Sequence, residues 1–240
     1  MLKSPWSIYN YPIKSYETDR NGKMTWHSFF HYLQESAYLN AQENDFGYEF
    51  LERENAYWVL TRVLVQLDKM PKWTDTVEIK TWPRGADGLF AVRDFNISVD
   101  GEQMGRVTTY WMIVDKETRR PKRLDDYDFL QAKFIEDKAF PDQLNKINSD
   151  GDFHIIDHRK VYASDLDVNG HVNNAAYVRW VMDAYSSKNK KVLREFEINF
   201  LGELMLNDEF DVMQLGADEQ FYYTLKNMKG RDICRARLMC

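Results

Sequence analysis

The stretch that decides the fold is Asp167-Val168-Asn169-Gly170-His171-Val172-Asn173-Asn174, because a shorter echo of it, Asp19-Arg20-Asn21-Gly22-Lys23-Met24-Thr25, lies 148 residues earlier. Aspartate, asparagine and glycine recur in register, but the histidine of the later copy is a lysine in the earlier one. A chain that repeats a structural unit and keeps an imidazole in one copy is typical of a duplicated fold with one chemical site. We therefore expect chemistry in the second copy and binding or packing in the first.

The repeat extends beyond the turn. Apolar residues at helical spacing follow Lys23 and recur after His171, which predicts a helix over about 25–44 and a second helix after His171. Strand-type alternation follows each helix, around 63–67 and 77–80 in the first copy and around 196–200 and 210–212 in the second. Both copies therefore predict an α+β layout in which one helix lies against an antiparallel sheet.

Length and composition predict two domains. The chain of 240 residues suits two units of about 120 residues each, and its 44% hydrophobic residues are enough for a core in both. Asp, Lys, Asn and Pro are frequent between about 125 and 152, which is typical of a linker. We place an N-terminal domain at 1–130, a linker at 131–152 and a C-terminal domain at 153–240.

Charge and hydropathy exclude several classes of protein. A net charge of −6 argues against nucleic acid or an anionic membrane as partner, because both need a strong basic field. No apolar run is long enough for a membrane span. The first residues show neither a signal core nor a transit segment, so the expected location is the cytoplasm.

No metal or organic cofactor is expected. His27 and His31 share a helical face, but neither has acidic or thiol partners at a useful spacing, and the same holds for the pair His154 and His158. Cys234 and Cys240 lack a metal-type spacing and are expected to be reduced, idle thiols. The sequence also lacks the dinucleotide fingerprint, the phosphate loop, the nucleophile elbow and Cys-x-x-Cys.

Two basic clusters run against the net charge. Either they are solvated segments, one near a strand end and one near a helix C-terminus, or they form a dock for an acidic carrier or a phosphate. The charge pattern alone leaves both interpretations open. The clusters are Lys116, Arg119, Arg120, Lys122 and Arg123, and then Lys188, Lys190, Lys191 and Arg194.

The motif Asp-x-Asn-x-His-Val-Asn-Asn leading into an aromatic-rich helix, here 167–180, resembles the signature of the acyl-acyl carrier protein thioesterases, plant-type fatty acyl hydrolases with bacterial relatives. Segments 33–37, 58–62, 73–78 and 116–120 are similar to the N-terminal half of that family. The resemblance implies two tandem hot dog domains, each a long helix wrapped by an antiparallel β-sheet. It also implies hydrolysis of fatty acyl-acyl carrier protein, with the acyl carrier protein as partner and no cofactor, and it leaves open whether the chain forms a homodimer.

The catalytic residues of the family are carried over one at a time. Its aspartate, asparagine and histidine match Asp167, Asn169 and His171 without gaps. Its glutamate lies on the first strand after the helix, and the nearest match is Glu203, after a one-residue adjustment. The cysteine that follows this glutamate in the plant enzymes is Leu204 here, which counts against a cysteine nucleophile.

These residue types suit thioester hydrolysis, which needs a base or nucleophile and donors for the oxyanion. We expect His171 at the point where a turn enters a helix, close to the unpaired N–H groups of the first helical turn. Asn169 then orients the carbonyl or the water, and Asp167 fixes the imidazole or its neighbours. Glu203 serves as general base or as nucleophile, and the sequence does not separate these two routes.

Two other functions stay open. The alternatives to a thioesterase are a non-catalytic acyl-carrier binding module and a hot dog dehydratase that acts on a 3-hydroxyacyl thioester. The binding module is disfavoured because the second copy has His171 and Glu203, whereas the first copy has Lys23 and Met70 at the corresponding positions. The dehydratase is disfavoured by the absence of a histidine followed by Pro-Gly-Asp. An Asp-x-Asn-Gly turn also often exists only for turn and cap hydrogen bonding.

The first copy is expected to bind the acyl chain and measure its length. Its helix carries bulky and small groups that either line and stop an apolar tunnel or form the core under the sheet. They are Phe29, Phe30, Tyr32, Leu33 and Ala37.

Overall fold

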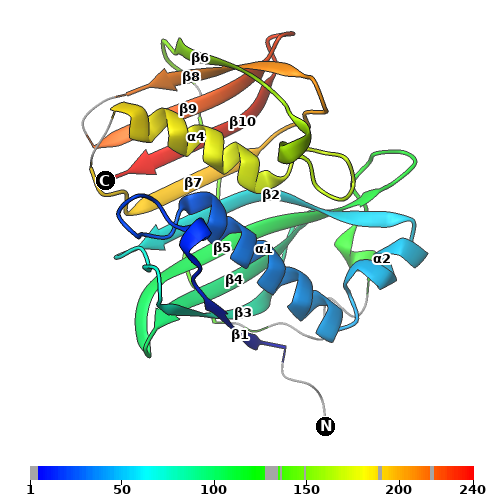
Figure 1. Ribbon diagram of the computed structural model, residues 1–240. Coiled ribbons are helices and arrows are strands. Elements are labelled where there is room, and N and C mark those ends of the chain that lie inside the picture. The colour runs from blue at the N-terminus through cyan, green and yellow to red at the C-terminus, as the bar shows by residue number, and fades with distance from the viewer. Residues whose placement is uncertain (1–4, 128–134, 136, 149, 189–190, 217–218) are drawn as a thin grey trace. The chain divides into compact units, whose positions relative to one another are not determined.

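A computed structural model describes the chain apart from residues 1–4, 128–134, 136, 149, 189–190 and 217–218 (Figure 1). The described residues cluster into two compact units. The first contains residues 1–25 and 31–143, and the second contains residues 26–30 and 144–240. Each unit is described by itself.

In the first unit, the described strands form an antiparallel sheet in the order β1-β3-β4-β5-β2. From His31 onward the long helix α1 belongs to this unit and lies along one face of the sheet (Figure 1). The elements are β1 (Ser7–Pro12), the 3-10 turn η1 (Ser15–Glu17), α1 (Trp26–Glu43), α2 (Tyr48–Arg53), β2 (Ala56–Leu67), β3 (Thr76–Asp87), β4 (Phe90–Val99), β5 (Glu102–Asp115) and η2 (Leu124–Asp126).

Helix α1 confirms the predicted helix over about 25–44. Polar contacts fix it against the sheet. On β1, the ring of Tyr11 stacks on Tyr32 with centroids 4.5 Å apart, and its hydroxyl lies 3.0 Å from that of Ser36. On β4, the buried guanidinium of Arg93 donates to the amide oxygen of Asn40 at 2.7 Å. The apolar residues of α1 that are buried include Phe29, Phe30, Leu33, Ala37 and Ala41.

In the second unit, the described strands form an antiparallel sheet in the order β7-β10-β9-β8-β6. Aromatic residues of the helix α4 (Asn174–Lys188) pack on this sheet. The ring centroids of Trp180 and Phe210 on β8 are 4.5 Å apart, and those of Tyr185 and Phe221 on β9 are 5.4 Å apart. The predicted α+β layout is therefore confirmed in each unit. The elements are β6 (His154–Lys160), η3 (Ala163–Asp165), α4 (Asn174–Lys188), β7 (Glu195–Phe200), β8 (Glu209–Leu215), β9 (Gln220–Asn227) and β10 (Asp232–Met239).

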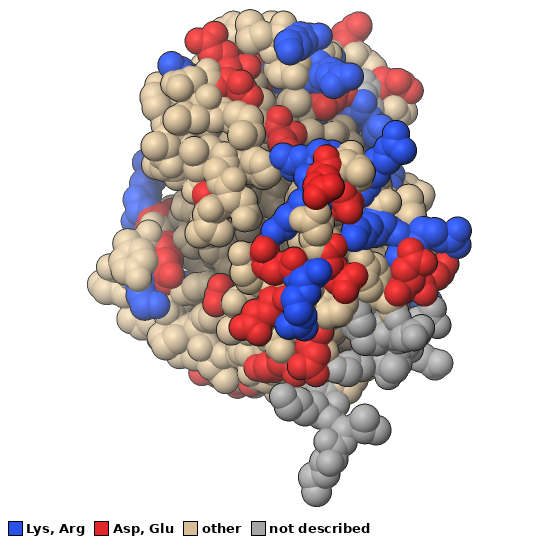
Figure 2. Space-filling view, turned by 90° about the vertical axis from the view of Figure 1, so that its right-hand side faces the viewer, with Lys and Arg blue, Asp and Glu red and all other residues tan. Residues whose placement is uncertain are grey.

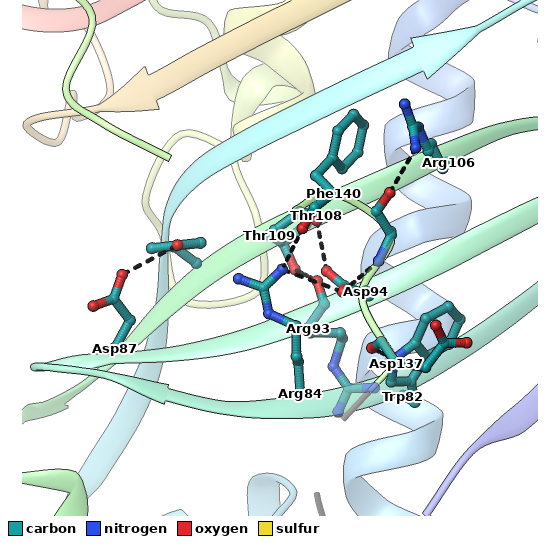
Figure 3. A network of polar contacts seen from close by, with 12 residues as sticks. Trp82, Arg84, Asp87, Arg93, Asp94, Arg106, Thr108, Thr109, Asp137 and Phe140 are labelled. Carbon is teal, nitrogen blue, oxygen red and sulfur yellow. Dashed lines mark hydrogen bonds and ion pairs between the residues drawn. The ribbon is translucent and has the colours of Figure 1, made fainter. Parts of the chain in front are cut away.

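Part of the predicted linker lies outside the described residues, but residues 137–143 belong to the first unit and run across its sheet. Asp94 on β4 accepts the N–H of Ala139 at 2.9 Å (Figure 3). Arg106 on β5 donates to the carbonyl of Ala139 at 2.9 Å, and its guanidinium lies 4.5 Å from the ring of Phe140. Successive side chains on a strand point to opposite faces, so Asp94 and Arg93 face opposite ways. The segment therefore crosses the face that is turned away from α1.

Residues 144–148 are held to the second sheet in a similar way. Asn199 on β7 accepts the N–H of Ile147 at 2.7 Å. Arg235 on β10 donates to the carbonyl of Ile147 at 3.0 Å and pairs with Asp232 at 2.5 Å. The connecting backbone thus forms hydrogen bonds with polar side chains of each sheet, in place of the hydrogen bonds that it would form with water.

Candidate active site

The turn from Asp167 to His171 is closed by its own aspartate. The Oδ1 atom of Asp167 accepts the backbone N–H groups of Asn169 at 2.8 Å and of His171 at 3.2 Å. The N–H of Asp167 in turn donates to the carbonyl of His171 at 2.8 Å. Gly170 has φ +79°, a conformation that a side chain would strain. The sequence Asp-x-Asn-Gly-His therefore fixes the backbone on which the imidazole stands.

His171 lies three residues before α4, whose first residue is Asn174. The side-chain oxygen of Asn173 accepts the N–H of Ala175 at 2.8 Å, and its carbonyl accepts that of Ala176 at 2.8 Å. These two N–H groups are already paired, so the expectation that the first helical turn offers unpaired donors beside His171 is wrong for them.

Glu203 lies in the loop between β7 and β8, and its predicted place on a strand is wrong. The N–H groups of Leu201 and Gly202 both donate to the carbonyl of Ile233, at 2.8 and 3.1 Å. Two successive donors on one acceptor break the regular ladder, so β7 ends at Phe200. The loop that follows carries Glu203 back toward the turn.

The structure brings His171 and Glu203 together. The Nε2 atom of His171 lies 3.9 Å from Oε2 of Glu203, with side chains 21% and 47% exposed. This distance exceeds a direct hydrogen bond and is one that a water molecule can bridge. Asn169 is exposed in the same turn, two residues before the imidazole. Asp167 contributes through the backbone of the turn.

The first unit contains the same turn without these groups. Oδ1 of Asp19 accepts the N–H groups of Asn21 at 2.8 Å and of Lys23 at 3.0 Å. The N–H of Met24 then donates to Pro71 at 2.8 Å, as that of Val172 donates to Leu204 at 3.2 Å in the second unit.

This second pair of bonds aligns the loops of the two copies. Pro71 corresponds to Leu204, so Met70 corresponds to Glu203, as the sequence predicted. Lys23 and Met70 thus stand where the second unit has its imidazole and its carboxylate.

One half-buried ion pair near the turn was missed by the sequence reasoning. Asp165 in η3 is buried, accepts the N–H of Tyr162 at 2.8 Å and contacts the guanidinium of Arg179 on α4. Its carbonyl accepts the N–H of Asn173 at 2.9 Å. The spacing of fourteen residues between the two charges had given no signal, because the partners are neighbours only after the turn and the first turns of α4 have formed.

Comparisons with known proteins identify the family. The model of the acyl-ACP thioesterase N-terminal domain matches residues 8–131, and that of the acyl-ACP thioesterase C-terminal domain matches residues 150–239. The chain belongs to the acyl-ACP thioesterase family.

Among its relatives are two from Arabidopsis thaliana, oleoyl-acyl carrier protein thioesterase 1 and palmitoyl-acyl carrier protein thioesterase, both chloroplastic. The first is 30% identical over 191 residues, covering 72% of this chain and 52% of the relative. The second is 30% identical over 192 residues, covering 73% and 46%. The chain thus spans about half the length of the curated relatives it matches.

Solved acyl-ACP thioesterase structures share its fold. An acyl-ACP thioesterase from Bacteroides thetaiotaomicron superimposes with a TM-score of 0.89 at 24% identity, covering 98% of this chain and 97% of that one. A 12:0-ACP thioesterase from Umbellularia californica gives a TM-score of 0.86 at 22% identity, covering 100% and 98%. The predicted fold class, α+β with two tandem hot dog domains, is confirmed.

The residue that follows Glu203 is Leu204, and its side chain is 1% exposed. It anchors the loop in the core. Of the two cysteines, Cys234 is buried, which raises the pKa of its thiol, and Cys240 contacts the hydroxyl of Tyr185.

Among the residues that the structure describes, no group of three or more His, Cys, Asp or Glu side chains is placed to hold a metal ion. His158 instead pairs with Asp211 at 2.5 Å. None of the helices in the described ranges has the length and hydropathy that crossing a bilayer requires.

The first basic cluster of this acyl-ACP thioesterase chain is largely paired with nearby acids. Lys122 lies 3.4 Å from Asp115, and Arg123 lies 3.1 Å from Asp125. Lys116 pairs with Glu52 on α2. Figure 2 shows blue and red side chains interspersed over the centre and right of the face that it presents. In the second cluster, Lys190 and the side chain of Lys188 lie outside the described part of the chain.

Proposed function

We propose that this protein hydrolyses the thioester of fatty acyl-acyl carrier protein, releasing a free fatty acid and the carrier. One observation carries the proposal: the turn that both units share brings a histidine to a glutamate in the second unit only, at 3.9 Å. Membership of the acyl-ACP thioesterase family supports the same chemistry. The partner is an acyl carrier protein, whose phosphopantetheine arm supplies the sulfur of the thioester, and the reaction takes place in the cytoplasm.

In the proposed reaction, Glu203 takes a proton from a water molecule that lies between its carboxylate and His171. The water oxygen attacks the thioester carbon, and the carbonyl becomes an oxyanion. The Asn169 amide and the His171 imidazole donate hydrogen bonds to that charge. The carbon–sulfur bond then breaks, and the proton held by the His171 and Glu203 pair passes to the sulfur, so water and thioester become acid and thiol.

Two roles follow from exposure and contacts. Glu203 is the more exposed partner of the pair, 47% against 21% for His171, which suits a base that must meet water and substrate. Asp167 is a positioning residue, since its carboxylate is engaged by the two N–H groups of the turn. In the competing route, Glu203 attacks the carbonyl itself, the carbon–sulfur bond breaks, the thiolate leaves and takes up a proton, and an anhydride remains. Water then hydrolyses the anhydride, and attack on the Glu203 carbonyl carbon places an oxygen of the carboxylate in the product acid.

The test is hydrolysis of a panel of acyl-carrier substrates, with free thiol and free fatty acid measured together. We expect His171→Ala and Asn169→Ala to lower the rate by about two to four decades, the usual scale for losing a base or an oriented donor. Glu203→Gln should be comparably harmful. The matched controls are Lys23→Ala and Asn21→Ala, which change the same positions of the first turn and should keep the wild-type rate.

The competing functions give different results in the same assay. A binding module would retain acyl carrier without releasing thiol, and a dehydratase would consume 3-hydroxyacyl substrate with the thioester intact. Full turnover in His171→Ala would remove the proposed site. Label in Glu203 after a single turnover in ¹⁸O-water identifies the anhydride route, because direct attack of water on the thioester places the label only in the fatty acid.

A further inference from the structure

The side chain of Tyr177 reaches the loop that carries Glu203. Its hydroxyl oxygen accepts the N–H of Leu204 at 3.1 Å. That N–H belongs to the peptide unit directly after Glu203, so the bond fixes the backbone from which the carboxylate extends. The carbonyl of Leu204 accepts the N–H of Val172 at 3.2 Å, and that N–H belongs to the peptide unit directly after His171. Leu204 is thus the common anchor of both groups.

Tyr177 is itself held rigidly. It belongs to the first turns of α4 and is 2% exposed. Its ring packs edge-on against Trp180 at 5.3 Å and against Phe200 at 5.7 Å. Burial raises the pKa of its hydroxyl, so the hydroxyl stays protonated at neutral pH. A buried, neutral hydroxyl on a closely packed ring is suited to holding a loop in one position.

The first copy of the repeat shows what the turn looks like without this bond. The position that corresponds to Tyr177 in the aligned turns is Phe29, which has no hydroxyl. The position that corresponds to Leu204 is Pro71, which has no N–H. Donor and acceptor are therefore both missing in the copy that lacks the histidine and the glutamate. The turn still closes there, through Met24 and Pro71 at 2.8 Å.

We infer that Tyr177 is a positioning residue that holds Glu203 at its working distance from His171 through the backbone of Leu204. This inference rests on the proposed function for its kinetic consequence. The hydroxyl is dispensable for closing the turn, as the first unit shows, but it accompanies the carboxylate that must be aimed. The first copy is thus a natural control for the second.

The experiment compares Tyr177→Phe with the double variant Tyr177→Phe/Leu204→Pro. The single variant removes the acceptor and leaves a buried N–H unpaired, so it should lose both thermal stability and kcat. We expect kcat to fall about 10- to 100-fold, with KM for acyl carrier within about twofold of wild type. The double variant restores the residue pair of the first copy and removes the unpaired N–H. Because this variant also removes the buried side chain of Leu204, we expect kcat to stay low whether or not Tm returns.

The matched control is Tyr185→Phe, which removes a hydroxyl from the same helix, where it donates to the carbonyl of Lys191 at 3.1 Å. It should leave kcat unchanged. A wild-type kcat in Tyr177→Phe, or its return together with Tm in the double variant, would show that Tyr177 only satisfies a buried N–H.

A second readout does not depend on turnover. We expect the NMR chemical shifts of the His171 imidazole at one fixed pH to change in Tyr177→Phe in the same direction as in Glu203→Gln, and to stay unchanged in Tyr185→Phe. Unchanged imidazole chemical shifts in Tyr177→Phe would overturn the inference. If the wild-type protein releases no thiol from any acyl-carrier substrate, the proposed function fails, and this NMR comparison still decides whether Tyr177 positions the carboxylate.

Discussion

The buried carboxylate of Asp94 loses its contact with water when the chain folds, and this desolvation is unfavourable for its ionised form. Asp94 is fully buried on β4, and burial raises its pKa although Thr108, Ala139 and Arg84 all favour the charged form. The hydroxyl of Thr108 donates to it at 2.6 Å, and Arg84 lies 3.4 Å away. Its contacts fasten the connecting segment to the sheet (Figure 3), while its desolvation opposes the ionised state.

The stability of Asp94→Asn relative to wild type should therefore increase as the pH rises. The folded protein holds a proton on Asp94 more tightly than the unfolded chain does. Wild type thus loses stability between the unfolded pKa of about 3.9 and the raised folded pKa, whereas asparagine does not titrate. Urea unfolding at pH 4, 5.5 and 7 measures the difference in free energy of unfolding, variant minus wild type. A difference that is constant over this range would mean that Asp94 titrates alike in both states.

At the scale of single elements, periodicity predicted the two long helices, α1 and α4, because each buries one stripe of apolar residues. For β2, which runs over Ala56–Leu67, periodicity predicted only the second half, residues 63–67. A register shift between Leu60 and Arg62 changes which residues face the core, so the alternation that identifies 63–67 does not continue backward through the strand.

The candidate site was predicted from the sequence in part. His171 and the turn around it follow from a local motif whose hydrogen bonds span four residues. The position of Glu203 relative to the strand did not follow, since the end of β7 depends on the carbonyl of Ile233, a distant residue on the chain. Helical spacing alone does not single out Tyr177, yet its difference from Phe29 is visible in the aligned copies.

Helix α1 carries the prediction on acyl length. Leu33→Ala removes a buried side chain, 3% exposed, and should shift the preferred acyl chain upward. Burying one methylene is worth about 0.8 kcal/mol, so space for two more carbons favours the longer substrate by about 1.6 kcal/mol. The control is Leu51→Ala in the cluster with Ala41 and Phe46, where the burial is matched. Rates across a series of acyl-carrier lengths decide the matter, and equal relative rates in both variants would place the selector elsewhere.

The molecule as a whole contains one turn built twice, with two sets of side chains on it. The bonds of Asp19 and Asp167 to their turns agree within a few tenths of an ångström. The backbone of this turn is therefore compatible with either set. Folding and chemistry are carried by different residues of the same motif.

Converting the second copy to the residues of the first should accordingly abolish activity and spare the fold. We expect His171→Lys/Glu203→Met to lower thioester hydrolysis by at least about three decades, with the free energy of unfolding within about 1 kcal/mol of wild type, since both positions are partly exposed. Hydrolysis assays and urea unfolding of the same preparation measure both. The reverse pair in the first copy, Lys23→His/Met70→Glu, should leave the rate unchanged. Loss of folding in the first variant would contradict the equivalence of the two turns.

The fastening of residues 137–147 also governs how a protease meets this chain. Exposed polar loops between compact units are where nicking concentrates, and Pro141, Asp142 and Gln143 are exposed. A protease must draw several residues on either side of its cut into an extended form, and here the flanking backbone is bonded to Asp94 and Arg106 on one side. Asn199 and Arg235 hold it on the other. Cleavage within 137–147 therefore requires that these hydrogen bonds break first. The rate of cleavage then measures how often the segment detaches from the side chains that hold it.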